Sequence, residues 1–213
     1  MNLMRIIERV QREFPDVKGA EIVEDINDIQ KDYAIETEIL KTSGNLTIVT
    51  NTVTYALLTA FPTLDKVLRV DFLDSTGELV DRTDELKMDI KPDGNVTFYD
   101  YYGDAITTIA DTVTTIKFYY SYTPATLVIG TLTASPDIPS QLHDGLVYGE
   151  LARLYARIPT TIKTYPDGST AKTKDFNSVQ FNEAKYREYV IKGKKLANQE
   201  KSSLSVYSQA DQF

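Results

Sequence analysis

The chain has 213 residues, 42% of them hydrophobic and 25% charged, so it can bury a sizeable core in one domain or in one domain with an inserted subdomain. It contains no cysteine, which excludes a disulfide scaffold and cysteine-ligated zinc or iron-sulfur sites. A formal net charge of −8 argues against a general nucleic-acid-binding protein, whose surface should be basic. No apolar run approaches membrane-spanning length, so we expect no membrane partner.

The first part of the chain, residues 1–43, is predicted to form two helices of a bundle. Apolar residues recur at helical spacing over residues 3–14, with Asn2 as the expected cap and Pro15 as the stop. A second apolar stripe over residues 18–40 leaves the other faces of that helix mostly acidic. Four of these acids are candidates for charges between subunits or along a DNA channel: Glu24, Asp25, Asp28 and Asp32.

Residues 44–136 are predicted to form an inserted β subdomain. Thr, Val, Ile, Tyr and Phe dominate this region, and turn signals divide it into short segments. Apolar and polar residues alternate over 67–72 and 86–90, as expected for half-buried antiparallel strands. We therefore expect a small antiparallel sandwich or barrel.

The next region, residues 137–201, is predicted to form the other two helices of the bundle. The segment 139–158 carries apolar residues on more than one face, which predicts a central, buried helix. Two prolines and a Pro-Asp-Gly turn in 159–173 predict an exposed loop. A last helix over 176–198, capped by Asp175 or Asn177, ends in basic residues. Three of its lysines are further candidates for charges between subunits or facing DNA: Lys192, Lys194 and Lys195.

Residues 202–213 are predicted to form an extended docking tail. They show no helical stripe, yet they carry more apolar surface than a purely solvating tail needs. We expect this tail to be disordered in the isolated subunit and to dock on a partner through four side chains: Leu204, Val206, Tyr207 and Phe213. The predicted fold class is thus α+β, a four-helix bundle with an inserted β-sandwich or barrel and an extended tail.

The charge is distributed unevenly along the chain. Residues 1–40 hold ten acids and five bases, whereas residues 172–201 hold eight bases and four acids. The two ends could attract each other or neighbouring copies.

The sequence gives little support for catalysis or a bound cofactor. The single histidine, His143, is expected to cap a helix or lie on the surface, because a zinc site needs three or four ligands. Asp100, Asp104 and Asp111 could support glycoside hydrolysis, but acids at strand ends and turns are ordinary. No phosphate-binding glycine loop is present. We expect no enzyme activity, catalytic residue, metal or cofactor.

Two aromatic runs, residues 98–102 and 118–122, leave a second interpretation open. Exposed aromatic platforms are typical of carbohydrate- or receptor-binding β modules of virions or cell surfaces. Alternate aromatics that fill a sheet core explain the same pattern, and we favour this explanation.

One part of the sequence carries a family resemblance. In residues 119–127 an expected strand ends at Pro124, and after a short linker residues 138–155 begin with Ile-Pro and continue as polar residues and an apolar helix. This segment, with two helices before the β insertion and two after it, resembles the head-to-tail adaptor (connector or tail-tube collar) proteins of short-tailed and related phages.

The resemblance implies a structural virion protein without an active site. It implies a homo-oligomeric ring, of about twelve subunits in such families, that joins the capsid portal to the tail and lines the DNA channel. The implied partners are the portal protein, a tail or nozzle protein and transiently passing DNA, bound without sequence specificity. The implied location is the virion neck, after assembly in the host cytoplasm, with the C-terminal tail docked on the portal or an adjacent copy.

Overall fold

The computed structural model describes residues 1–49, 52–80, 87–91, 94–100, 102–106 and 113–210, with the backbone alone for residues 200–210. The fold is α+β, with antiparallel sheets. The chain divides into two compact units: a helical unit of Met1–Leu40 and Pro124–Phe213, and a sheet unit of Lys41–Thr123. Residues 124–136, predicted as part of the β insertion, therefore group with the helices.

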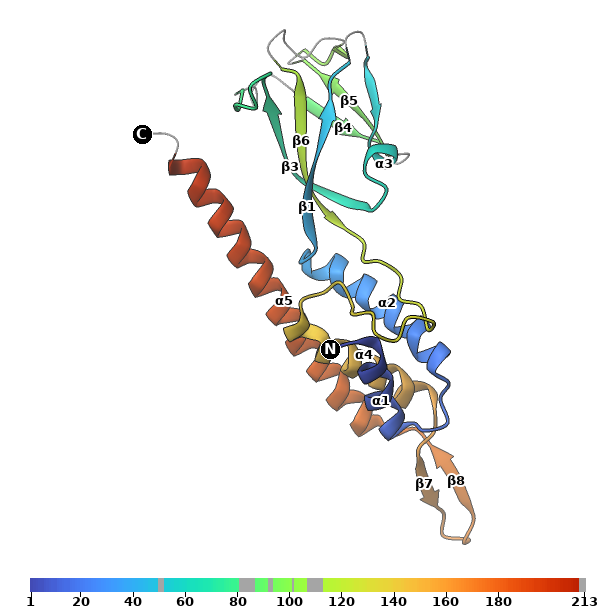
Figure 1. The fold of residues 1–213 in the computed structure, drawn as a ribbon. Coiled ribbons are helices and arrows are strands. Elements are labelled where there is room, and N and C mark those ends of the chain that lie inside the picture. The colour runs from blue at the N-terminus through green and yellow to red at the C-terminus, as the bar shows by residue number, and fades with distance from the viewer. Residues whose placement is uncertain (50–51, 81–86, 92–93, 101, 107–112, 211–213) are drawn as a thin grey trace. The chain divides into compact units, whose positions relative to one another are not determined.

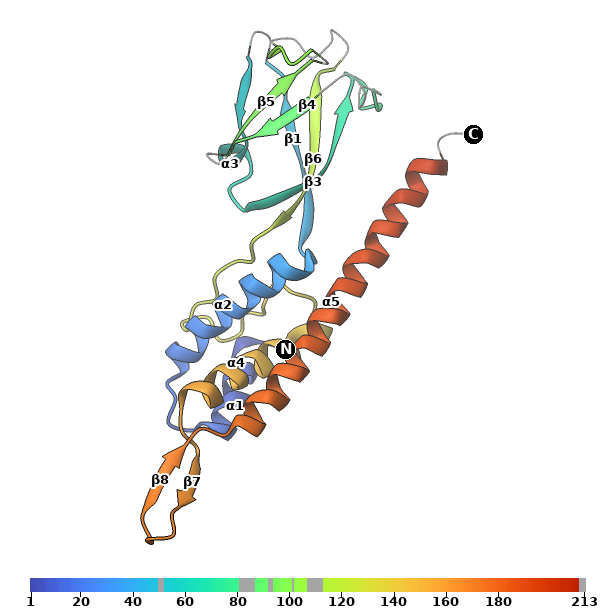
Figure 2. The ribbon, with the colours of Figure 1, turned by 180° about the vertical axis from the view of Figure 1, so that it is seen from behind.

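The helical unit is built from long helices packed around a shared apolar core (Figures 1 and 2). Its helices are α1 (Leu3–Glu13), α2 (Gly19–Thr37), α4 (His143–Arg157) and α5 (Phe176–Ala210). Helix α4 packs against α1, α2 and α5, and its Leu146 and Leu154 are fully buried. The prediction that the helix within 139–158 is central and buried is therefore confirmed. A 3-10 turn, Ser140–Leu142, precedes it.

The expected helix caps are present. The Arg5 amide donates to Asn2 Oδ1 at 3.1 Å, which satisfies a donor that the first turn of α1 leaves open. At the start of α5, Asp175 Oδ1 accepts from the Asn177 and Ser178 amides, so Asp175 rather than Asn177 is the cap. A hydrogen bond from the Ser178 hydroxyl at 2.7 Å, together with those from the two amides, holds the pKa of the Asp175 carboxyl below its ordinary value.

Helix α5 extends well beyond its predicted end at residue 198. It continues to Ala210, so residues 202–210 are helical and the extended-tail prediction is wrong for them. No glycine or proline follows Gly193 to stop the helix, and each added residue contributes a backbone hydrogen bond. Phe213 lies outside the described residues.

Two glycines let the helices of this unit approach closely. A Cβ at Gly145 of α4 would lie 2.7 Å from the Tyr189 Cβ of α5. A Cβ at Gly193 of α5 would lie 2.6 Å from the hydroxyl oxygen of Tyr33, which donates to the Tyr189 carbonyl at 2.5 Å. Side chains at either glycine would force α5 away from its neighbours.

The sheet unit holds two three-stranded sheets in its described residues. One has the order β1 (Lys41–Thr47), β6 (Thr115–Tyr122), β3 (Leu64–Leu73), and the other β2 (Thr54–Ala56), β5 (Asn95–Tyr99), β4 (Lys87–Ile90). A short helix, α3 (Leu57–Ala60), follows β2, which brings the α-helices of the described chain to five. All strand pairs are antiparallel, and the sheets do not close into a barrel, so the barrel alternative is wrong.

The two sheets share one aromatic core. Phe72 of β3 meets Phe98 of β5 edge to face, with ring centroids 6.1 Å apart. In β6, Phe118 and Tyr120 are buried while Tyr119 between them is only partly covered. Alternate aromatics of this run therefore fill the core, as we favoured from the sequence.

The connection between α4 and α5 is a β-hairpin rather than the predicted loop. Strands β7 (Thr161–Thr164) and β8 (Thr170–Thr173) pair antiparallel across a Pro-Asp-Gly turn. Gly168 has φ +83°, which glycine tolerates, and Asp167 accepts from the Ser169 amide and hydroxyl. The hairpin projects from the helices (Figures 1 and 2).

Candidate functional site

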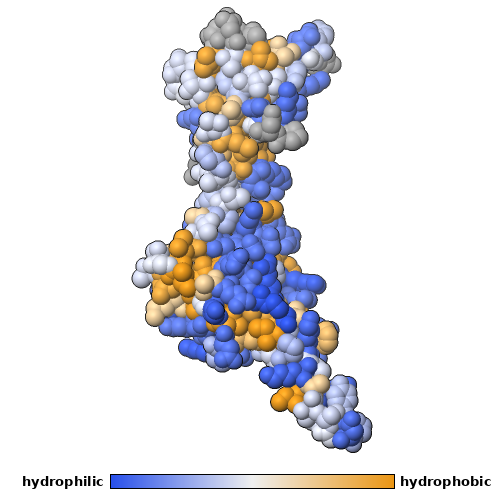
Figure 3. All heavy atoms as spheres, turned by 90° about the vertical axis from the view of Figure 1, so that its right-hand side faces the viewer, coloured by the Kyte–Doolittle hydropathy of each residue, from blue (hydrophilic) through white to orange (hydrophobic). Residues whose placement is uncertain are grey.

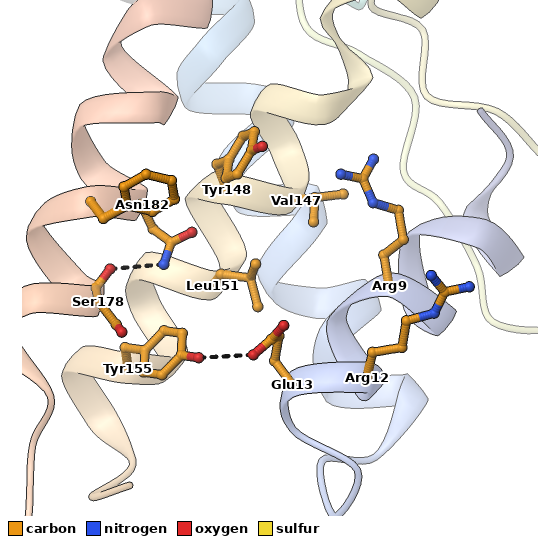
Figure 4. Close-up of a pocket in the computed structure, with 10 residues that line it drawn as sticks. Arg9, Arg12, Glu13, Val147, Tyr148, Leu151, Tyr155, Ser178 and Asn182 are labelled. Atoms are coloured by element: carbon orange, nitrogen blue, oxygen red, sulfur yellow. Dashed lines mark hydrogen bonds between the residues drawn. The ribbon is translucent and has the colours of Figure 1, made fainter. Parts of the chain in front are cut away.

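The helical unit has a groove between α1, α4 and α5 with a volume of about 390 Å³ (Figure 4). Val147 and Leu151 of α4 contribute its apolar part, and Arg9, Arg12 and Glu13 of α1 line one side. Several of the polar lining groups are engaged within the chain. Arg9 pairs with Asp144, and the Tyr155 hydroxyl donates to Glu13 at 3.0 Å. The groove therefore resembles a packed helix junction more than a binding site for a small molecule.

The acidic side of α2 faces the basic side of α4. Arg157 lies 2.8 Å from Glu21 and 3.3 Å from Asp25, and Arg153 lies 3.4 Å from Asp32 and 3.8 Å from Asp28. The Asp25 side chain is only 19% exposed, so this acid faces α4. The Asp28 and Asp32 side chains remain 68% and 67% exposed and can still meet a partner.

A buried carboxyl lies beside this ion network. Glu150 of α4 is fully buried, and neither of its carboxyl oxygens finds a hydrogen-bond donor among the described residues. Burial, followed by the nearby charge of Asp25, raises the pKa of Glu150 to about 8, and Arg157 and Arg153 offset only part of this rise. Glu150 is therefore protonated at neutral pH, and its proton can be donated to the Asp25 carboxylate.

Glu150 was not predicted from the sequence, although a signal was present. Glu150, Arg153 and Arg157 are spaced three and four residues apart in a helix that the apolar pattern already placed at the centre. Charged residues on a buried helix need partners. The acids of α2 were therefore the natural candidates.

The basic residues of α5 contact their own chain. Lys194 lies 3.0 Å from Glu36 of α2, and the Lys192 ammonium lies 4.3 Å from the centre of the Tyr189 ring. Lys195 lines a shallow depression with Leu142 and Leu196. The attraction expected between the two ends of the chain thus operates in part within one subunit.

His143 is neither a surface residue nor a cap. It is 3% exposed, and its Nε2 lies 2.7 Å from the Ile138 carbonyl while its Nδ1 lies 2.8 Å from the Met1 amine. Because a carbonyl only accepts, Nε2 carries the proton and Nδ1 accepts from the amine. Burial lowers the pKa of His143. This ring is structural.

The other chemistry candidates are not assembled into a site. The Asp104 amide donates to Asp100 Oδ1 at 2.9 Å, so Asp100 shapes a turn, while Asp111 lies outside the described residues. Within the described part of the chain, no three His, Asp or Glu side chains are grouped to hold a metal ion. Nor does any helix there have the length and apolar character needed to cross a bilayer.

Three of the predicted docking residues lie in the last turns of α5. Leu204, Val206 and Tyr207 have a described helical backbone, and their side chains lie outside the description. In a helix, Leu204 and Tyr207 share a face because they are three residues apart, whereas Val206 does not. The extended conformation predicted for these residues is therefore replaced by a helix.

Comparison with known families decides what kind of protein this is. A family model described as SU10 adaptor protein matches residues 1–193, most of both units. The chain belongs to the SU10 adaptor protein family. A search of curated proteins returned no match.

An SU10 adaptor protein is a structural component of a phage. Proteins of this family are not a class of enzyme. The family implies association with portal and tail proteins and a place in the virion neck. The recognition made from residues 119–127 and 138–155 is thereby confirmed.

Proposed function

We propose that this SU10 adaptor protein assembles into a closed ring that joins the capsid portal to the tail and encloses the channel through which DNA passes. The observation that carries this proposal is the family match over residues 1–193. Head-to-tail contact of unlike faces generates a ring when the rotation between copies closes. The acidic face of α2 would favour one register of such contacts, since its acids repel the same face of another copy.

The ring should be visible directly. We expect electron microscopy of the protein mixed with portal-bearing capsids to show one closed ring at the portal vertex. Capsids without the protein are the control. Single copies scattered over the capsid, or no density at the vertex, would rule out the connector function.

The end of α5 is proposed to dock on the portal or on an adjacent copy through Leu204, Val206, Tyr207 and Phe213. The motive is compositional, since this segment carries more apolar residues than a solvated helix end needs. In the helical conformation Leu204 and Tyr207 would form the contact, in the manner of an amphipathic helix placed in a groove.

Deleting residues 202–213 tests this docking. We expect the truncated chain to keep the melting temperature of the full chain, because the buried residues that the structure describes in α5 extend no further than Ala197. Its incorporation into capsids should fall sharply, measured by cosedimentation. Replacing Ser202 and Ser203 by alanine is a control that keeps the helix and its apolar residues. Normal incorporation of the truncated chain would show that the segment is dispensable.

The carbohydrate-binding alternative rested on the aromatic runs 98–102 and 118–122. Phe98, Phe118 and Tyr120 of these runs are buried in the sheet core, which favours the packing explanation for them, whereas Tyr102 is 87% exposed. Tyr101 lies outside the described residues.

A further inference from the structure

The β7–β8 hairpin, which we call the arm, has no core of its own. Most of its strand residues are exposed, with Ile162 65% exposed and Tyr165 at the turn 41% exposed. An isolated two-stranded hairpin is at best marginally stable in water. Its turn chemistry sets its shape, but burial of Ile162 against a partner would add stabilisation. The arm thus has the properties of a docking element.

The arm is basic on an acidic protein. Its two lysines, Lys163 and Lys172, outnumber its one acid, Asp167, which is already engaged in the turn. Lys172 is paired with Ile162 across the two strands, so these two exposed side chains share one face of the arm. With a net charge of −8 for the whole chain, an acidic surface of another copy is an available partner.

Helix α2 offers such a surface, a stripe formed by Glu24, Asp28, Asp32 and Ile35. These residues recur every three or four positions and are exposed, Ile35 at 44%. The outer face of α2 forms a hydrophilic area in Figure 3. The stripe spans about 16 Å along the helix, and extended strands of four or five residues span a similar length. Both surfaces combine charges with an exposed apolar residue.

A hollow of about 310 Å³ lies beside this stripe and carries an unused acceptor. Its lining includes the carboxylates of Glu24 and Asp28, the amide of Gln30 and one cation, Lys31, so its net charge is negative. Gln30 is 1% exposed, and its Oε1 finds no donor among the residues described. A buried acceptor without a partner is costly, so a ligand with a donor is expected there.

The orientation of the Gln30 amide is fixed by its neighbours. Its Nε2 donates to the Ala125 carbonyl at 2.9 Å and to Asn27 Oδ1 at 3.2 Å. Asn27 Oδ1 also accepts from the Leu127 amide at 2.8 Å, which sets the orientation of that side chain in turn. Gln30 Oε1 therefore stays an acceptor. With two carboxylates beside it, the hollow fits an ammonium group.

We propose that the arm of one copy docks on the α2 stripe of the next copy, with a lysine of the arm in the hollow beside Gln30. This inference rests on the proposed ring and names the surfaces that hold it together. Ile162 covers Ile35, while Lys172, on the same face of the arm, meets Glu24, Asp28 and the free acceptor. The contact joins unlike faces, as a closed ring requires.

Cysteine crosslinking in the assembled ring tests this contact, because the natural chain has no cysteine. We expect the double variant Lys172→Cys with Glu24→Cys, oxidised on portal-bearing capsids, to give a ladder of covalent multimers. Each single variant should give none. The matched control, Lys91→Cys with Glu24→Cys, places the first cysteine on the sheet unit and should also give none.

Charge reversal gives an independent measurement. Lys172→Glu should reduce ring formation at least roughly tenfold, since like charges would then meet, and Asp28→Lys should do the same. Combining the two substitutions should restore the ring. The control Lys87→Glu makes the same charge change on the sheet unit and should leave the ring intact.

The outcomes separate this inference from the proposed function. If the unaltered protein forms no ring on capsids, the proposed function fails. If it forms a ring but the arm reversal has no effect, or no ladder appears, the arm contact is wrong. If the arm reversal reduces ring formation but the α2 reversal does not, the arm binds another partner, such as DNA or a tail protein. That result would overturn the docking on α2.

Discussion

Replacing Glu150 by glutamine should stabilise the protein at pH 8 and remove much of the pH dependence of its unfolding. The carboxyl is fully buried without a donor among the described residues, and its pKa is raised from an ordinary 4.5 to about 8. Glutamine has nearly the same shape and cannot ionise, so it avoids the cost of a buried charge beside Asp25.

The direction of this pH dependence follows from proton binding. Between about pH 4.5 and 8 the folded protein keeps the Glu150 proton that the unfolded chain has lost, so its stability falls as the pH rises. Below this window both states are protonated, and the two proteins should be similarly stable. Above it the folded protein carries the full penalty, which we place on the order of 3 kcal/mol.

Urea unfolding at several pH values between 5 and 8.5 measures this effect. The unfolding free energy of the glutamine variant should vary less with pH than that of the unaltered protein, and the gap should widen toward pH 8.5. Glu8→Gln, a change of the same kind at an exposed position of α1, is the control. Parallel pH profiles for all three proteins would contradict a protonated Glu150.

Leu146→Asp should unfold the helical unit. Leu146 is fully buried in α4, the helix that contacts α1, α2 and α5. A carboxylate buried there without a partner would lower the free energy of unfolding by several kcal/mol. That is a large part of the roughly 5–15 kcal/mol that stabilise a typical protein. We therefore expect a loss of helical circular dichroism and of the cooperative thermal transition.

The matched control is Ile191→Asp on α5. It makes the same kind of apolar-to-acid change at a side chain that is 53% exposed, so the charge stays in water. This variant should melt close to the unaltered protein. A Leu146→Asp protein that melts at the unaltered temperature would mean that α4 is not central to the core.

The sequence predicted those features of the fold that depend on local pattern. The apolar stripe after Asn2 and the apolar coverage of residues 139–158 gave the positions of α1 and α4, since burial follows helical periodicity. Alternation over 67–72 identified β3 for the same reason, at a period of two.

The features that were not predicted from the sequence depend on more than the local pattern of apolar and polar residues. The length of α5 beyond residue 198 reflects an unbroken helix without an apolar stripe, which a search for stripes overlooks. The hairpin was taken for a loop because its strands bury nothing, so no alternation distinguishes them. Gln30 and Glu150 emerge as unusual only when their neighbours are known, because an unpaired buried atom is a property of tertiary packing.

The route of the chain into and out of the sheet unit has a consequence for how such proteins can diversify. Lys41 opens β1 directly opposite Ser121 of β6, and opposed residues of antiparallel strands lie about 5 Å apart. The two ends of the insertion thus meet at a single place. Loss, duplication or exchange of the whole module needs one local splice and leaves the helical sequence on either side in frame. Recombination can therefore replace the sheet unit as a whole while the helical unit is retained.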